Sequence, residues 1–245
     1  MCGIVGIVDF HHKISDEKHI LEGMKNKLSH RGPDAEGSFI SNNVLLGHRR
    51  LVVVDPKGGS QPMMKKIEGN EYIIVYNGEL YNTEELRRDL ISKGMSFDAY
   101  SDTEVLLKTY IYYGEGFISK LNGIFAFAIY DKKQNKIILA RDPMGVKPLF
   151  YYKRDNMLVF ASEIKALFKH PYIEPIIDET SLTELFSLGP AIAPGSGLYK
   201  DIYEVEPGYC MTMTYDDFKI YRYWQMKVYE NKETIDEAIQ HTIEL

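Results

Sequence analysis

Short apolar runs alternate with amphipathic stretches along the chain, and their periods separate strands from helices. Residues 2–9 form an apolar run relieved by two glycines, which is typical of a buried strand. The same kind of pattern predicts further strands at 44–54, 72–76, 124–131, 136–141, 149–152, 157–161, 209–214 and 219–223. Two of these pairs flank short polar turns and predict hairpins over 124–141 and 149–161.

Apolar residues at helical spacing predict helices between the strands. The clearest stripe is Ile20, Leu21, Met24 and Leu28, with Ser15 as its expected N-cap. The other predicted helices span 83–91, 101–113, 162–168, 178–188 and 234–243, and each begins at or next to a Ser, Thr or Asp. Strands and helices come in blocks, so the pattern favours an α+β layered fold with largely antiparallel sheets.

The final predicted helix has an apolar stripe without a stop signal. Ile235, Ala238, Ile239 and Ile243 share one face, and no glycine cap follows them. A helix of this kind needs a partner for its apolar face. We therefore expect one domain over residues 1–223, and in residues 224–245 a linker and the first helix of a second domain that this chain lacks.

Composition excludes several classes of protein. The chain has 245 residues, of which 44% are hydrophobic and 26% charged, and a net charge of −6. These values are ordinary for a globular protein and argue against nucleic acid as a partner. No apolar run approaches the roughly 18 residues of a membrane span, so no membrane contact is expected. Cys2 and Cys210 are the only cysteines, which fits a reducing cytoplasm and not a disulfide framework.

Metal and phosphate motifs are also missing from the sequence. The seven histidines do not pair with cysteines at zinc spacings. Gly114-Glu115-Gly116 does not fit a phosphate loop, and no Gly-x-x-x-x-Gly-Lys-Ser/Thr pattern occurs. We expect no metal and no cofactor in this chain.

The start of the chain offers a nucleophile. If Met1 is removed, Cys2 carries a thiol and a free α-amine on one residue. An α-amine has a reference pKa of about 7.7–8.0, so near pH 7 it can be partly neutral and take the proton of the thiol. A cysteine also occurs at position 2 of proteins in which it has no role, so the position alone leaves both interpretations open.

Several motifs occur in a fixed order along the chain. They are residues 1–6 (Met-Cys-Gly-Ile-Val-Gly), 30–34 (His-Arg-Gly-Pro-Asp), 48–51 (His-Arg-Arg-Leu), 76–82 (Tyr-Asn-Gly-Glu-Leu-Tyr-Asn) and 101–104 (Ser-Asp-Thr-Glu). As a set they resemble the class II glutamine amidotransferases, which are N-terminal-nucleophile hydrolases. Residues 141–150 (Arg-Asp-Pro-Met-Gly-Val-Lys-Pro-Leu-Phe) and 161–167 (Ala-Ser-Glu-Ile-Lys-Ala-Leu) are most similar to glutamine-hydrolysing asparagine synthetase. The resemblance covers residues 2–225 and implies a four-layer αββα sandwich of antiparallel sheets.

The resemblance implies glutamine as the substrate and gives three residues a part in the chemistry. Cys2 would attack the amide carbon and form a thioester, with its own α-amine as the base. The Asn77 side chain and the Gly78 backbone N–H would stabilise the negative oxygen of the transition state. The bland alternative for Asn77-Gly78 is an ordinary turn.

The resemblance also assigns the residues that would bind glutamine. Arg50 would bind the α-carboxylate through its guanidinium fork, and Asp102 and Glu79 would take the α-ammonium. The backbone of the following strand would line the pocket, at Leu51, Val53 and Val54. An ordinary ion pair is the alternative for Arg50 and Asp102.

Neighbouring charged residues of these motifs receive other assignments. Alternation places Arg49 and Arg50 on opposite faces of a strand, so only one of them should face the ligand, and motif position favours Arg50. Arg31 and Asp34 are expected to serve structure or contact with the absent domain. Cys210 is expected to be a small core residue.

The implied function is that of a glutaminase domain. Ammonia from glutamine would serve the ATP-dependent conversion of aspartate to asparagine by an absent C-terminal synthetase domain. ATP and magnesium would belong to that domain, since this chain has no Ser-Gly-Gly-x-Asp run. One alternative is the amidotransferase half of an enzyme that aminates phosphoribosyl pyrophosphate or a sugar phosphate. Another is a glutamine-binding module without catalysis. The sequence is compatible with a homodimer.

Overall fold

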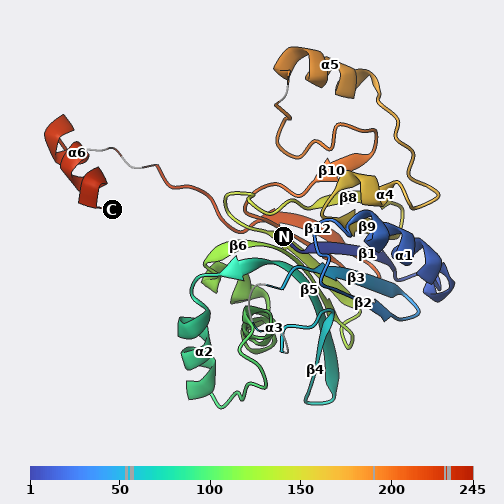
Figure 1. The fold of residues 1–245 in the computed structure, drawn as a ribbon, viewed down its shortest axis with the longest axis horizontal. Coiled ribbons are helices and arrows are strands. Elements are labelled where there is room, and N and C mark those ends of the chain that lie inside the picture. The colour runs from blue at the N-terminus through green and yellow to red at the C-terminus, as the bar shows by residue number, and fades with distance from the viewer. Residues whose placement is uncertain (53–54, 56–57, 190, 229, 231–232, 245) are drawn as a thin grey trace.

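Two antiparallel sheets of six strands each lie face to face in the computed structural model (Figure 1). The structure describes residues 1–244 except 53–54, 56–57, 190, 229 and 231–232. The first sheet has the order β10-β8-β9-β1-β3-β2 and the second has the order β12-β11-β7-β6-β5-β4. This arrangement confirms the predicted α+β fold with antiparallel sheets.

The elements have the following bounds. The first sheet contains β1 (Gly3–Asp9), β2 (Ala35–Ile40), β3 (Val44–Arg50), β8 (Phe150–Arg154), β9 (Met157–Ala161) and β10 (Ile202–Glu204). The second contains β4 (Met63–Ile67), β5 (Asn70–Leu80), β6 (Gly123–Asp131), β7 (Lys136–Arg141), β11 (Tyr209–Met213) and β12 (Phe218–Arg222). The helices are α1 (Lys18–Lys27), α2 (Thr83–Ser92), α3 (Asp102–Tyr113), α4 (Ile164–Leu167), α5 (Glu179–Leu188) and α6 (Ile235–Glu244), with 3-10 turns η1 (Ser15–Glu17) and η2 (Gly114–Lys120).

Three apolar layers hold the two sheets and their helices together. The middle layer lies between the sheets and includes Ile4 and Leu46 from the first sheet and Val75 from the second. One outer layer packs α1 and α4 on the first sheet, and the other packs α2 and α3 on the second. Because both faces of β1 are covered, all seven of its residues are buried, which explains its continuous apolar run.

The alternative interpretation of Asn77-Gly78 as an ordinary turn is wrong. Strand β5 continues to Leu80, and Asn77 and Gly78 pair with Ala126 and Phe125 of β6. A Cβ at Gly78 would lie 2.5 Å from the backbone oxygen of Ile124, so glycine here permits close strand approach. The Asn-Gly pair is therefore part of a ladder.

Other element boundaries also differ from the predictions. The strand expected over 44–54 ends at Arg50, and β2, β4 and β10 were not predicted. Strand β2 has no buried residue, so it lacks the apolar pattern by which strands are found. Ser15 does not cap α1 but begins a 3-10 turn, whereas Ser101 caps α3 by accepting a hydrogen bond from the backbone N–H of Glu104 at 3.3 Å.

The C-terminal helix α6 lies apart from the sandwich (Figure 1). None of its described residues is buried. The division into a domain over 1–223 and a connecting segment over 224–245 stays a prediction. Within the described ranges, every helix falls short of the combined length and hydropathy that a membrane span requires.

A histidine lies in the layer between the sheets. His48 on β3 is 1% exposed, and its Nε2 lies 3.1 Å from the backbone oxygen of Tyr76 on β5. Burial lowers the pKa of His48 to about 4; the hydrogen bond to Tyr76 opposes this shift, and the charge of Arg50 adds to it. His48 is therefore neutral at pH 7, and Nε2 donates to the Tyr76 oxygen. Its Nδ1 has no hydrogen-bond partner among the described residues.

We expect His48 to make the stability of the fold depend on pH. Its pKa is lower in the folded chain than in the unfolded chain, so unfolding binds a proton between about pH 6.5 and pH 4. Stability is then lost as the pH falls through this window. The advantage of the wild type over His48→Asn should shrink by about 2 kcal/mol between pH 7 and pH 5, as measured by urea unfolding.

His170, another buried histidine whose pKa is lowered to about 4, will keep part of the pH dependence in both proteins. The exposed His19 supplies a control, and His19→Asn should retain the wild-type dependence. A constant difference between wild type and His48→Asn at both pH values would contradict the assignment of a neutral His48.

Candidate active site

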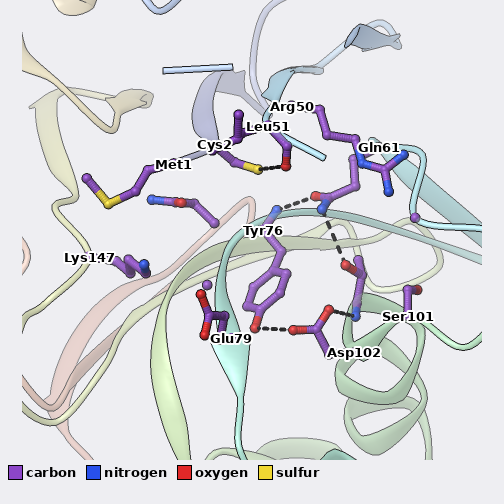
Figure 2. Close-up of a pocket in the computed structure, with 14 residues that line it drawn as sticks. Met1, Cys2, Arg50, Leu51, Gln61, Tyr76, Glu79, Ser101, Asp102 and Lys147 are labelled. Atoms are coloured by element: carbon purple, nitrogen blue, oxygen red, sulfur yellow. Dashed lines mark hydrogen bonds between the residues drawn. The ribbon is translucent and has the colours of Figure 1, made fainter. Parts of the chain in front are cut away.

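A pocket opens at one end of the layer between the sheets. Cys2 directly precedes β1, and the pairing of Gly3 with Arg49 places it beside the end of β3. The cavity has a volume of about 190 Å³. Its lining residues come from the chain start, β3, β5, α3 and two loops (Figure 2): Met1, Cys2, Arg50, Leu51, Gly59, Gln61, Tyr76, Asn77, Gly78, Glu79, Ser101, Asp102, Thr103 and Lys147.

Because side chains alternate between the two faces of a strand, certain side chains from both sheets point into this pocket. Ile4, Leu46 and Val75 face the layer between the sheets. Residues an even number of positions apart on a strand face the same side, as Cys2 and Ile4 do, or Arg50 and Leu46, or Asn77 and Val75. The side chains of Cys2, Arg50 and Asn77 therefore point into the end of that layer. The three residues thus meet although they come from distant parts of the chain.

Arg50 is buried and its guanidinium is held at the pocket wall. Its Nη2 donates to the backbone oxygen of Asp55 at 2.6 Å. A Cβ on Gly59 would lie 2.3 Å from the same nitrogen, so a larger residue here would displace the guanidinium from this position. Arg49 points the other way, toward α1, and pairs with Glu36 at 2.7 Å. The opposite orientation of the two arginines agrees with the predicted alternation.

Asp102 opens helix α3 and lines the pocket from the side opposite the first sheet. Its Oδ2 accepts hydrogen bonds from the Tyr76 hydroxyl at 2.9 Å and the Leu80 N–H at 3.3 Å. Its Oδ1 accepts from the Thr103 N–H at 2.8 Å. Burial raises the pKa of Asp102, and these three hydrogen bonds act in the opposite direction.

Asn77 presents an unused donor to the pocket. Its side chain is 2% exposed, and its Nδ2 has no hydrogen-bond partner among the residues that the structure describes. A buried donor left without an acceptor costs about 1–3 kcal/mol. Such a donor, in the same pocket as a thiol, is what stabilisation of an oxyanion requires. The next residue, Gly78, also lines the pocket.

The motif at residues 30–34 fixes the backbone on both sides of the pocket. Arg31 Nε donates to the backbone oxygen of Cys2 at 2.8 Å, and Arg31 Nη1 donates to Glu163 at 2.9 Å. Asp34 accepts from the backbone N–H of Val52 at 2.8 Å. Arg31 and Asp34 therefore have structural roles, which is one of the two roles predicted for them.

The charge of Glu163 supports this framework. Burial acts to raise its pKa, but hydrogen bonds from Lys165, Arg31 and His30 outweigh burial and lower it to about 2. Glu163 is thus an anion at any pH near neutrality. Arg31 in turn remains anchored beside the first residues of the chain.

Most of the residues predicted for the site line this one pocket. The structure brings together Cys2, Arg50, Leu51, Asn77, Gly78, Glu79 and Asp102. The thiol of Cys2 donates to the backbone oxygen of Leu51 at 3.6 Å. Val53 and Val54 lie outside the described residues. Cys210 is buried in the outer layer on the second sheet, as expected for a core residue.

Sequence reasoning missed Gln61, Tyr76 and Lys147. Lys147 lies across the pocket from Arg50 and Asp102 (Figure 2). Its backbone is fixed on both sides, since its N–H donates to Asp142 at 2.9 Å and its oxygen accepts from Arg141 at 2.8 Å. The signal was present, because Lys147 belongs to the motif at 141–150, which had served only for the resemblance.

The described part of the chain contains no group of three or more His, Cys, Asp or Glu that could hold a metal ion. The polar groups of the pocket are instead hydrogen-bond donors, carboxylates, a guanidinium and a thiol. They suit an amino acid that carries a carboxamide.

Comparison with known proteins supports the same interpretation of the pocket. The chain is 46% identical to asparagine synthetase [glutamine-hydrolyzing] 3 of Bacillus subtilis, over 98% of this chain and 39% of that protein. It is 40% identical to asparagine synthetase [glutamine-hydrolyzing] 1 of the same organism, over 90% of this chain and 35% of that protein. The chain thus spans well under half the length of these curated relatives.

Solved structures share the fold. Glutamine phosphoribosylpyrophosphate amidotransferase from B. subtilis matches with a TM-score of 0.67 and 22% identity, over 92% of this chain and 50% of that chain. The family model described as "Glutamine amidotransferase domain" matches residues 1–224. The chain therefore belongs to the family of glutamine amidotransferase domains.

Proposed function

We propose that this domain hydrolyses glutamine to glutamate and ammonia through a thioester on Cys2. One observation carries the proposal: a thiol and an unused buried amide donor share a pocket with an arginine and a carboxylate. Arg50 and Asp102 match the two charged groups at the amino-acid end of glutamine. Cys2 and Asn77 match the carboxamide at its other end.

The chemistry uses groups of this chain alone. The Cys2 α-amine takes the thiol proton, and the sulfur attacks the amide carbon of glutamine. The carbonyl oxygen becomes negative and accepts hydrogen bonds from Asn77 Nδ2 and the Gly78 N–H. The protonated amine gives its proton to the leaving nitrogen, and ammonia departs. Water then attacks the thioester with the amine as base, which releases glutamate and restores the thiol.

This mechanism requires that Met1 is removed. Met1 lines the pocket, and its peptide bond makes the Cys2 nitrogen an amide, which has no free lone pair to act as a base. We infer that processing both opens the pocket and creates the base. The intact mass of the active protein should lack one methionine.

We further propose that the ammonia serves a synthetase domain that makes asparagine from aspartate. The support is the likeness to asparagine synthetases of more than twice this length. The segment 224–245 would connect the two parts, and ATP and magnesium would act in the synthetase domain. Transfer to phosphoribosyl pyrophosphate or a sugar phosphate has weaker support, because at 22% identity the amidotransferase structure is alike in fold alone.

Replacement of Cys2 tests covalent catalysis. In processed protein, Cys2→Ala should lower the rate of glutamate release from glutamine by at least about a thousandfold, because no other group can form the thioester. Cys210→Ala is the matched control and should remain active, since Cys210 lies in the core outside the pocket. Equal rates for wild type and Cys2→Ala would reject the thioester, and no glutamate release from either protein would favour a binding module without catalysis.

Replacement of Arg50 tests recognition of the carboxylate. Arg50→Lys keeps the charge but loses the bidentate fork, so the KM for glutamine should rise about tenfold or more. Arg49→Lys should leave KM unchanged, because Arg49 faces α1. Steady-state kinetics of both variants checks this, and an unchanged KM in Arg50→Lys would remove Arg50 from the binding site.

A further inference from the structure

Tyr76 lines the pocket and has no assigned task. It is 2% exposed, and its ring extends toward Asp102 between the chain start and α3 (Figure 2). Each of its polar groups has a partner. Its N–H donates to Gln61 Oε1 at 2.6 Å, its backbone oxygen accepts from His48 at 3.1 Å, and its hydroxyl donates to Asp102 Oδ2 at 2.9 Å.

The direction of the last hydrogen bond is fixed. Burial raises the pKa of Tyr76 well above its ordinary value, and the charge of Asp102 and the hydrogen bond to it add to the shift. The hydroxyl therefore stays protonated and donates, and the carboxylate accepts. Gln61 is itself held, since its Nε2 donates to Thr103 Oγ1 at 3.3 Å.

The Tyr76 hydroxyl also limits how Asp102 can turn. An ionised carboxylate has about four acceptor sites. Tyr76, Leu80 and Thr103 donate to the carboxylate of Asp102. An ammonium group would be a further donor to it. Two of the three donors are backbone N–H groups, so Tyr76 is the only side chain among the described residues in this set.

We propose that Tyr76 is a positioning residue for the substrate: its hydroxyl holds Asp102 in the orientation that receives the α-ammonium of glutamine. This inference rests on the proposed glutaminase function. Tyr76 would also connect the residues at the two ends of the ligand. Its hydroxyl contacts Asp102, at the α-ammonium end, and its backbone continues into Asn77 and Gly78, at the carboxamide end. No chemical step passes through Tyr76.

Tyr76→Phe removes the hydroxyl and keeps the ring. The KM for glutamine should rise about tenfold, with a smaller effect on kcat, because a hydrogen bond to a charged group is lost. Glutaramic acid, which is glutamine without its α-amine, should show the same inhibition constant in wild type and Tyr76→Phe. If Tyr76→Phe weakened the binding of glutamine and glutaramic acid equally, the proposal would be overturned, because Tyr76 would then shape the pocket without acting on the α-ammonium.

A pH profile gives a readout that a purely structural role would not move. The hydroxyl lowers the pKa of Asp102, so its removal raises that pKa. Asp102 is then protonated at higher pH, and the rise of the glutamine KM on acidification should begin at higher pH in Tyr76→Phe. The other polar groups around the pocket are common to both proteins: Cys2, Arg31, His48, Arg50, Glu79, Lys147 and the N–H groups of Leu80 and Thr103. Identical profiles would count against the proposal.

The fold supplies a matched control. Tyr110 donates its hydroxyl to buried Asp131 at 3.1 Å, outside the pocket. Tyr110→Phe removes a tyrosine–aspartate hydrogen bond of the same kind and should leave the glutamine KM unchanged. Thermal melting of both variants shows how much of any effect comes from stability.

Binding separates this inference from the proposed function. Calorimetry with glutamine and the Cys2→Ala protein measures affinity without turnover, and adding Tyr76→Phe should weaken binding about tenfold. Unchanged binding would overturn the role of Tyr76 and leave the glutaminase standing. If the wild type binds glutamine but releases no glutamate, the glutaminase function is rejected. The effect of Tyr76→Phe on glutamine binding can still be measured in that case.

Discussion

The antiparallel pairing of β1 with β3 is the constraint on which the pocket depends. It places the first residues of the chain beside the end of a strand that begins more than forty residues later. Cys2 and Arg50 are therefore neighbours through the backbone ladder of a buried sheet, and not through mobile loops. A site built on strands in this way keeps its geometry before a ligand arrives, which is what catalysis by preorganised groups requires.

Buried charged side chains fix the loops around the pocket, in addition to the pairing of the strands. Asp142 is fully buried and accepts hydrogen bonds from the backbone N–H groups of Phe125 and Lys147. Arg31, which is also buried, donates to the backbone oxygen of Cys2 at the chain start, and the exposed Asp34 accepts from the backbone N–H of Val52 after β3. Asp142 and Arg31 satisfy backbone groups that would otherwise be costly to bury. The polar motifs around the pocket thus stabilise loops that have no regular secondary structure.

Periodicity predicted much of the fold from the sequence, and motif order predicted much of the pocket. The buried strand at the chain start and the two hairpins were visible because apolar residues dominate them. Strand β2 was not visible, since its side chains are largely solvated. The Asn77-Gly78 pair misled because local turn preference was overridden by pairing with β6. Tyr76 was missed for a related reason: a buried aromatic residue on a strand indicates a core, and Tyr76 does belong to one, so only its contact with Asp102 connects it with the site.

The continuation of β5 through residues 76–79 has a consequence for how the pocket tolerates change. Side chains on a strand alternate between its faces, so Asn77 and Tyr76 serve opposite sides of the second sheet. A slip of β5 against β6 by a single residue would exchange those faces and shift the donor by about 3.3 Å. Insertions and deletions near this ladder should therefore damage the pocket more than most substitutions, because a shift by one residue would move Asn77 and Tyr76 to the opposite faces of the sheet.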